Sequence, residues 1–191
     1  MDAKARAQAA LERGERARRA QRLPEALAAF TEAVAALRPA DQAAELAHAL
    51  TRQAQIHRDL HDDAAAEPPQ AEAVAIYRRL GDNRGLADAL RHLGDILGEA
   101  GRGEAAAPLM DEMLALYRSR DDVAPLEMAN VVRSAAVHAG RIGDRQAARD
   151  LWREARDRYA ALDEVFRQLT GRDINPGVEE SDRRLAAMSA E

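Results

Sequence analysis

The sequence contains no cysteine, few aromatic residues and no long apolar run. The absence of cysteine excludes disulfides, thiol catalysis and cysteine-based zinc sites. Aromatic residues make up 3% of the 191 residues, whereas hydrophobic residues, many of them alanine, make up 47%. This composition is typical of closely packed helices, and it is unlike a β-sandwich or barrel, whose strands need β-branched and aromatic residues.

Excess positive charge is also missing. The formal net charge is -5, so we expect no nucleic acid as the main ligand, because phosphate binding needs a basic face. Residues 1–21 carry charges throughout, as no signal peptide does, and no window approaches the ~18 apolar residues that a membrane span requires. We therefore expect a cytoplasmic protein without a membrane partner.

The clearest organised stretch runs from Leu86 to Tyr117. Apolar residues at helical spacing predict two amphipathic helices, and Gly101 and Gly103 predict a turn between them. One such hairpin cannot bury its apolar face alone. Copies of it must therefore stack against one another.

Aligned on this stretch, the chain contains four copies, and equivalent residues form five ladders in which each step spans roughly 40 residues. A glycine inside a helix costs about 1 kcal/mol relative to alanine, so Gly14 and Gly94 predict places where two helices cross closely. Large residues then fill the space beside each crossing. The members of the ladders, which we call rungs, are Gly14, Ala54, Gly94 and Ala136; Ala26, Ala66, Ala106 and Ala148; Phe30, Gln70, Met110 and Trp152; Ala33, Ala73, Met113 and Ala155; and Leu37, Tyr77, Tyr117 and Tyr159.

This pattern resembles the tetratricopeptide repeat family, which has small residues at the eighth, twentieth and twenty-seventh positions of its unit and an aromatic at the twenty-fourth. The stretch from Pro24 to Pro39 looks like a typical second helix of that family. Pro68 and Pro108 resemble the early prolines in the longer units of kinesin light chains and bacterial regulator arrays. The resemblance implies an all-α fold: an α-α superhelix, or right-handed solenoid of helical hairpins, with about four repeats and a C-terminal capping helix.

We accordingly expect a single repeat domain over residues 1–191. Its repeats are expected at 3–40, 41–82, 83–122 and 123–170, followed by a cap or tail at 171–191. Gln70 stands where the family has an aromatic, and Arg13 and Gln53 stand where its seventh position has leucine. These departures predict looser packing of the first two repeats. The helices are expected at about 3–21, 24–38, 42–61, 69–80, 84–100, 103–119, 124–141 and 145–170, with a last polar helix after residue 177.

Candidate catalytic and metal-binding residues are few. His57 and His61 would share one face of a helix, as a metal pair requires, but no second cluster supplies further ligands. The isolated His48, His92 and His138 are interpreted as surface or hydrogen-bonding residues, and Trp152 as core. The sequence has no phosphate-binding glycine loop, nucleophile elbow or zinc-protease motif. We therefore expect no enzyme activity, no cofactor and no metal.

In the tetratricopeptide family, the first helix of each repeat lines a concave groove. Arginine forks in such a groove are suited to the carboxylates of an acidic or C-terminal peptide, and the alternative is surface charge that neutralises itself. In the first copy, the corresponding positions are Gln8, Leu11, Glu15, Arg18 and Arg19. The residues that the resemblance predicts for partner binding are His48, Gln55, Arg58, Asp88, Arg91, Asp95, Glu99, Asn130, Arg133 and Arg141.

The resemblance thus implies a non-enzymatic scaffold or adaptor that binds a peptide or helix of a partner protein in its groove. The alternative is a self-associating or peptide-sensing regulatory module of a bacterial signalling system. Self-association would require an exposed apolar stripe, for which the alanine-rich second helices are the candidates. Homodimerisation is therefore left open.

Overall fold

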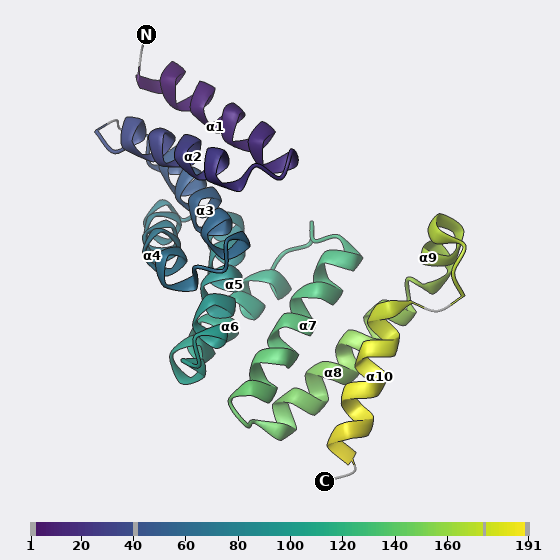
Figure 1. Cartoon of the computed structure of the whole chain (residues 1–191). Coiled ribbons are helices and arrows are strands. Elements are labelled where there is room, and N and C mark those ends of the chain that lie inside the picture. The colour runs from purple at the N-terminus through teal and green to yellow at the C-terminus, as the bar shows by residue number, and fades with distance from the viewer. Residues whose placement is uncertain (1–2, 40–41, 174, 190–191) are drawn as a thin grey trace. The chain divides into compact units, whose positions relative to one another are not determined.

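The computed structural model describes residues 3–39, 42–173 and 175–189. Over these residues the chain forms ten α-helices and no strand (Figure 1). They fall into two compact units, Met1–Gly101 (unit 1) and Arg102–Glu191 (unit 2), which are considered separately. The division lies in the glycine turn of the third expected repeat, so one continuous domain stays a prediction. The expected junction of the first two repeats, at residues 40 and 41, lies outside the described residues.

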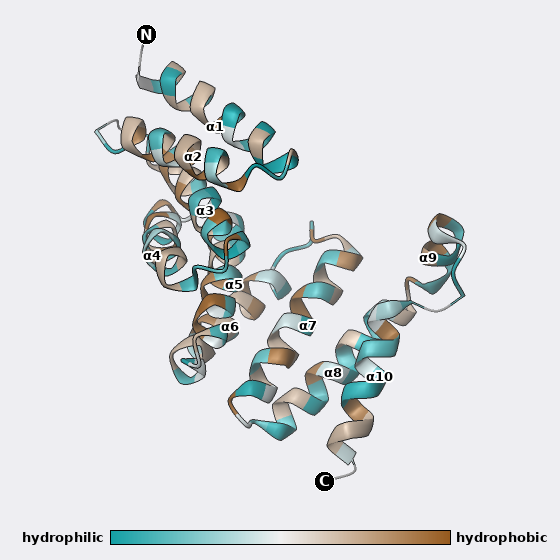
Figure 2. Cartoon of the chain, viewed as in Figure 1, coloured by the Kyte–Doolittle hydropathy of each residue, from teal (hydrophilic) through white to brown (hydrophobic). Residues whose placement is uncertain are grey.

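Unit 1 contains α1 (Ala3–Arg19), α2 (Leu23–Leu37), α3 (Ala43–Asp59), α4 (Asp63–Leu80) and α5 (Asn83–Glu99). Each helix packs against the next one along the chain, as stacked hairpins require. Polar and apolar residues alternate around the helices (Figure 2), and the apolar ones meet in the seams between them.

Unit 2 contains α6 (Gly103–Arg118), α7 (Pro125–Arg141), α8 (Arg145–Ala160), α9 (Asp163–Thr170) and α10 (Pro176–Ser189). Helix α7 packs against α6 and α8, and α10 packs along α8. Gly177 lets α10 approach closely, because a Cβ atom there would stand 2.5 Å from the Tyr159 ring. The expected C-terminal capping helix is therefore confirmed.

The five ladders form the core of both units. Every rung is buried except Tyr77, which is partly buried. At Gly14 a Cβ atom would lie 2.6 Å from Cε1 of Phe30, closer than any side chain tolerates. The crossing of α1 and α2 thus needs glycine, with Phe30 filling the space beside it. These stacked antiparallel helices confirm the expected α-α superhelix class.

Two expected helix boundaries are wrong. Helix α4 begins at Asp63, well before the predicted start at residue 69, because Asp62 caps it by accepting a hydrogen bond from the Ala65 N–H at 3.0 Å. The predicted helix at 145–170 is interrupted at Ala161 and Leu162, which separate α8 from α9. None of the helices in the described ranges is long and apolar enough to cross a membrane.

Candidate functional site

A hollow of about 530 Å³ opens among α3, α4 and α5 of unit 1. We call it the polar hollow, because its walls carry charged and amide side chains and no large apolar one. The apolar faces of the same helices lie in the core, so their backbones are held by packing while these polar side chains face the opening. Its lining residues are Thr51, Gln55, Arg58, Asp59, His61, Asp63, Gln70, His92 and Glu99.

Arg58 links two first helices across the polar hollow. From α3, its Nη2 atom donates to both carboxylate oxygens of Glu99 on α5, each at 3.1 Å. Its guanidinium is therefore already engaged by a carboxylate of the same chain. A partner that uses Arg58 must share or displace Glu99.

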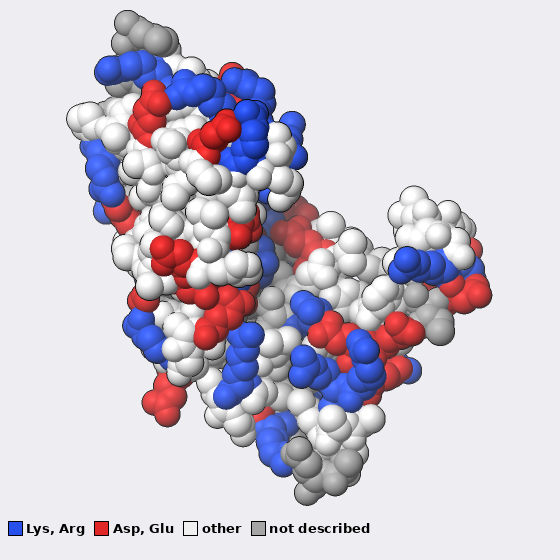
Figure 3. All heavy atoms as spheres, viewed as in Figure 1, with Lys and Arg blue, Asp and Glu red and all other residues white. Residues whose placement is uncertain are grey.

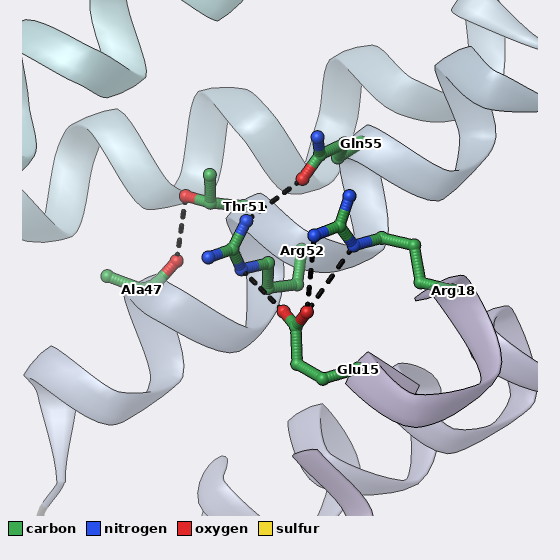
Figure 4. Close-up of polar contacts among 6 residues, drawn as sticks. All are labelled: Glu15, Arg18, Ala47, Thr51, Arg52 and Gln55. Carbon is green, nitrogen blue, oxygen red and sulfur yellow. Dashed lines mark hydrogen bonds and ion pairs between the residues drawn. The ribbon is translucent and has the colours of Figure 1, made fainter. Parts of the chain in front are cut away.

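A second polar network joins α1 to α3 (Figure 4). Glu15 accepts from Arg18 at 3.3 Å and pairs with Arg52 at 3.0 Å. Arg52 also donates to the side-chain oxygen of Gln55 at 3.0 Å. These bonds hold Gln55 at the wall of the polar hollow. Glu15 and Glu99 are thus already paired with arginines of the same unit.

His92 is held in its neutral form on the wall of the polar hollow. Burial, with Arg91 and Arg58 nearby, lowers the pKa of His92 to about 4. Its Nε2 atom lies 3.3 Å from Nη2 of Arg91, and because a guanidinium only donates, this nitrogen must accept. The imidazole is therefore a hydrogen-bonding group without charge at neutral pH.

The remaining predicted residues of unit 1 lie around the polar hollow or beside it. Asp88 and Arg91 pair on α5 at 3.9 Å, and Asp95 is partly buried on the same helix. His48, on α3, lines a neighbouring hollow with Glu15, and its pKa is lowered, chiefly by burial and then by Arg52.

In unit 2 the predicted groove residues are engaged differently. Asn130 accepts a hydrogen bond from the Tyr159 hydroxyl at 2.7 Å. Arg133 is held by Glu180 of α10 in a two-pronged pair at 2.6 and 3.2 Å. Arg141, the last residue of α7, is exposed. The C-terminal helix therefore already occupies the guanidinium that was predicted for a partner.

Two interpretations of histidines are wrong. His61 does not share a helix face with His57, because α3 ends at Asp59 and His61 has a φ of 60°, in the left-handed region. His138 is not a surface residue: it is 4% exposed, and neither ring nitrogen makes a hydrogen bond of good geometry within the described part of the chain. Burial, then Arg141, lowers the pKa of His138.

The sequence interpretation missed Arg52, His92 and Gln70 as members of this surface. Arg52 and His92 stand one repeat step apart, at equivalent places in consecutive repeats and next to a predicted groove position. The ladder spacing therefore contained the signal. Gln70 was noted only as a departure from the family, yet it is buried at the floor, where its Nε2 donates to the Ala89 carbonyl at 2.9 Å.

The sequence matches no family model and no curated protein. The structure is similar to a variant form of a putative kinesin light chain from Podosopora anserina with nearly identical TPR-like repeats. That match has a TM-score of 0.77 at 15% identity and covers 100% of this chain and 88% of that one.

Two further solved structures share the fold at lower coverage of their own length. BtubC (BKLC) from P. vanneervenii gives a TM-score of 0.72 at 18% identity, covering 85% of this chain and 64% of BtubC. A Rap protein complexed with Competence and Sporulation Factor gives a TM-score of 0.67 at 14% identity, covering 97% of this chain and 54% of the Rap chain. This chain thus spans just under two thirds of BtubC and about half of Rap. At such identities the likeness confirms the fold that the repeat pattern predicted.

Proposed function

Because this chain has the fold of the tetratricopeptide-like repeat proteins, we propose that it is a non-enzymatic scaffold that binds a segment of a partner protein on the first helices of its hairpins. In unit 1 these are α1, α3 and α5, and the polar hollow is the place of contact. The predicted residues of unit 2, Asn130, Arg133 and Arg141, belong to the same proposal, as does the cytoplasmic location expected from the sequence.

One observation carries the proposal. Buried rungs hold the backbones of α3 and α5, while the side chains that these two helices present to the polar hollow are polar groups outside the core. Binding sites are commonly concave and largely pre-formed, because ordering a surface during binding weakens affinity. A hollow of about 530 Å³ has room for a few side chains of a bound segment.

The lining favours a segment with many hydrogen-bonding groups over one of a single charge sign. Three carboxylates, those of Asp59, Asp63 and Glu99, face one guanidinium, that of Arg58. A strongly acidic segment would meet repulsion there, and a strongly basic one would compete with Arg58 for Glu99. Neutral His92, Thr51 and Gln55 offer donors and acceptors to amide and hydroxyl groups.

A solved structure of the same fold supports partner binding. The Rap structure is that of a complex with Competence and Sporulation Factor. The fold is therefore compatible with holding a ligand.

The experiment is a selection of displayed random peptides on the immobilised full chain, followed by affinity measurements with charge-reversed variants. The variant Arg58→Glu is expected to weaken selected peptides by more than about tenfold, because it removes a donor and adds a fourth carboxylate to the hollow. The matched control is Arg38→Glu, which also breaks an arginine–glutamate pair between helices, with Glu72 at 2.6 and 2.7 Å, but lies outside the polar hollow.

A second readout localises the peptide. Binding in the polar hollow should move the imidazole NMR signals of His92 and leave those of His138, in unit 2, unchanged. The proposal is wrong if no peptide is selected, or if selected peptides bind the two charge-reversed variants equally well.

A further inference from the structure

Helix α10 is attached to the rest of unit 2 mainly through polar contacts. It packs along α8 in the antiparallel direction (Figure 1), with Gly177 against Tyr159 at one end and Met188 against Arg149 at the other. Among the described residues of this helix, Ser181 alone is buried, whereas α8 buries four side chains. The other side chains of α10 are exposed or only partly buried. Little apolar burial therefore holds α10 in place.

Two ion pairs fix the register of α10. Glu180 pairs with Arg133 of α7 at 2.6 Å, and Asp182 pairs with Arg156 of α8, also at 2.6 Å. The four side chains are between 22% and 53% exposed, so water screens both pairs and each adds little stability. The attachment is thus specific in geometry but weak.

The C-terminal end of α10 meets two more arginines. Arg149 and Arg145 of α8 donate to the Met188 carbonyl at 2.8 and 3.3 Å. The last carbonyls of a helix have no partner within it and carry partial negative charge, so these two arginines recognise a helix end. Within the described part of unit 2, four guanidiniums therefore contact α10, at two carboxylates and at a helix C-terminus. The face that α10 covers is complementary to an acidic helix.

The pair of Arg133 and Glu180 lies at the edge of a hollow of about 420 Å³ among α7, α9 and the start of α10. We call it the apolar hollow, because its walls are mainly apolar. Three of its side chains remain more than half exposed with α10 in place. A competing helix that pairs with Arg133 would therefore find apolar surface beside it that α10 leaves uncovered. The large aliphatic and phenylalanine side chains of the lining are Leu126, Leu162, Val165, Phe166 and Leu169.

We propose that α10 is a built-in competitor: it occupies a docking face on α7 and α8 that an acidic helix of a partner protein can take over. The inference rests on the proposed function, because Arg133 is one of the residues of unit 2 predicted for partner binding. The present occupant shows what the partner must offer: small residues in the places of Gly177 and Ser181, and carboxylates in the places of Glu180 and Asp182. Because α10 is tethered, it competes at high effective concentration, and the partner must add contacts that α10 lacks. The apolar hollow supplies them.

Exchange of the two helices is visible at Trp152, which is the only tryptophan of the sequence. Its side chain is 1% exposed, and the guanidinium carbon of Arg184, on α10, lies 5.8 Å from the centroid of its ring. Release of α10 therefore uncovers Trp152 and increases the quenching of its fluorescence by acrylamide.

The first experiment tests whether α10 detaches. In the full chain, the double variant Glu180→Arg, Asp182→Arg turns both pairs into repulsions and should raise the quenching of Trp152 by at least about twofold. The matched control Asp150→Arg, Glu164→Arg changes the net charge equally but breaks pairs within α8 and within α9. It should keep the wild-type quenching. Circular dichroism checks that both variants stay helical.

The second experiment tests whether an acidic helix takes the face. The probe is a labelled synthetic peptide of residues 175–189 with blocked ends. Measured by fluorescence anisotropy, it should bind the double variant at least about tenfold more tightly than the wild-type chain, in which α10 occupies the face. The same peptide with Glu180→Arg and Asp182→Arg should bind neither chain.

A charge swap distinguishes release of α10 from general damage. Adding Arg133→Glu and Arg156→Asp to the double variant restores both pairs with reversed signs. The quenching of Trp152 should return to the wild-type level, and the acidic peptide should no longer bind.

The proposal is overturned if the double variant leaves Trp152 as protected as in wild type, because α10 is then a permanent cap. It is also overturned if the peptide binds both chains equally or neither of them, or if the charge swap restores nothing. The probe and the readout both belong to unit 2. These outcomes therefore differ from a failed peptide selection at the polar hollow, which contradicts the proposed function.

Discussion

The two units have cores of the same kind but different surfaces. In both, small and large rungs are buried, and at Gly14 in unit 1 the helix crossing is too close for a Cβ atom. Yet the hollow of unit 1 is lined by charged and amide groups, and that of unit 2 mainly by leucine, valine and phenylalanine. Packing therefore constrains the rungs and leaves the surface positions between them free to carry function.

The difference extends to how neighbouring helices are joined. In unit 1, first helices of successive hairpins exchange charged contacts, Arg52 with Glu15 and Arg58 with Glu99. In unit 2, helix α10 packs against α8, and its Glu180 pairs with Arg133 of α7. Lysine and arginine are interleaved with aspartate and glutamate over the face seen in Figure 3, in keeping with this local pairing. Ion pairs thus join the first helices of unit 1, whereas in unit 2 they join α6 to α8 and the cap α10 to α7.

The largest expected effect tests whether the large rungs matter equally in the two units. Phe30→Ala in unit 1 and Trp152→Ala in unit 2 should each lower the free energy of unfolding by about 3–5 kcal/mol, because both side chains are buried and would leave a cavity. Urea unfolding followed by circular dichroism measures both. Leu169→Ala, at an exposed position, should change the value by less than about 0.5 kcal/mol. A small loss in only one unit would show that its large rung does not support the core.

A smaller effect concerns how the stability of unit 1 depends on pH through His92 in the polar hollow. The pKa of His92 is about 4 in the folded chain and about 6.5 in an unfolded one, so acid protonates the unfolded state first. The neutral His92 therefore contributes to the free energy of unfolding in full above about pH 6.5. As the pH falls towards 4 this contribution is lost, and the loss is at most about 3 kcal/mol.

The variant His92→Gln should therefore flatten the fall in stability between these pH values, measured by urea unfolding at a series of pH values. The control His61→Gln, at an exposed residue, should keep the wild-type slope. If His92→Gln also keeps that slope, burial and the neighbouring arginines do not hold the imidazole neutral.

Gln70 allows a third comparison, because it is the only polar member of the large-rung ladder. Gln70→Ala should cost about 2 kcal/mol, through a cavity and the lost hydrogen bond to the Ala89 carbonyl. Gln70→Met, which restores the volume found at Met110 in unit 2, should cost only about 1 kcal/mol. Thermal or urea unfolding tests this order. A methionine variant more stable than wild type would mean that the hydrogen bond contributes nothing.

Much of the core was predictable because it repeats. Rungs one repeat step apart must occupy equivalent places, so Ala26, Ala66, Ala106 and Ala148 could all be assigned to the core from the sequence alone. The same spacing would have placed His138 correctly, because Ile96, one repeat step earlier, is buried. The place of His138 in the repeat, and not the chemistry of its imidazole, decides its burial.

Other features depend on contacts that no periodicity encodes. The early start of α4 rests on one cap, Asp62, which outweighs the two prolines within the helix. The contact of Glu180 with Arg133 joins positions whose separation in the chain lies outside the repeat. An exposed apolar stripe, for which the second helices were candidates, is found on α9, the short helix that follows the break at Ala161 and Leu162.

The central claim is that helices pack through close crossings that only small residues permit. It is tested most directly by comparing two glycine-to-alanine changes in helices, Gly14→Ala and Gly140→Ala. A Cβ atom at Gly14 would meet Phe30, whereas one at Gly140 would meet nothing within 4 Å. We expect Gly14→Ala to lower the free energy of unfolding by about 1 kcal/mol or more, and Gly140→Ala to raise it by about 0.5 kcal/mol. If both changes stabilise the chain, helix propensity alone sets their effect and the crossing imposes no constraint.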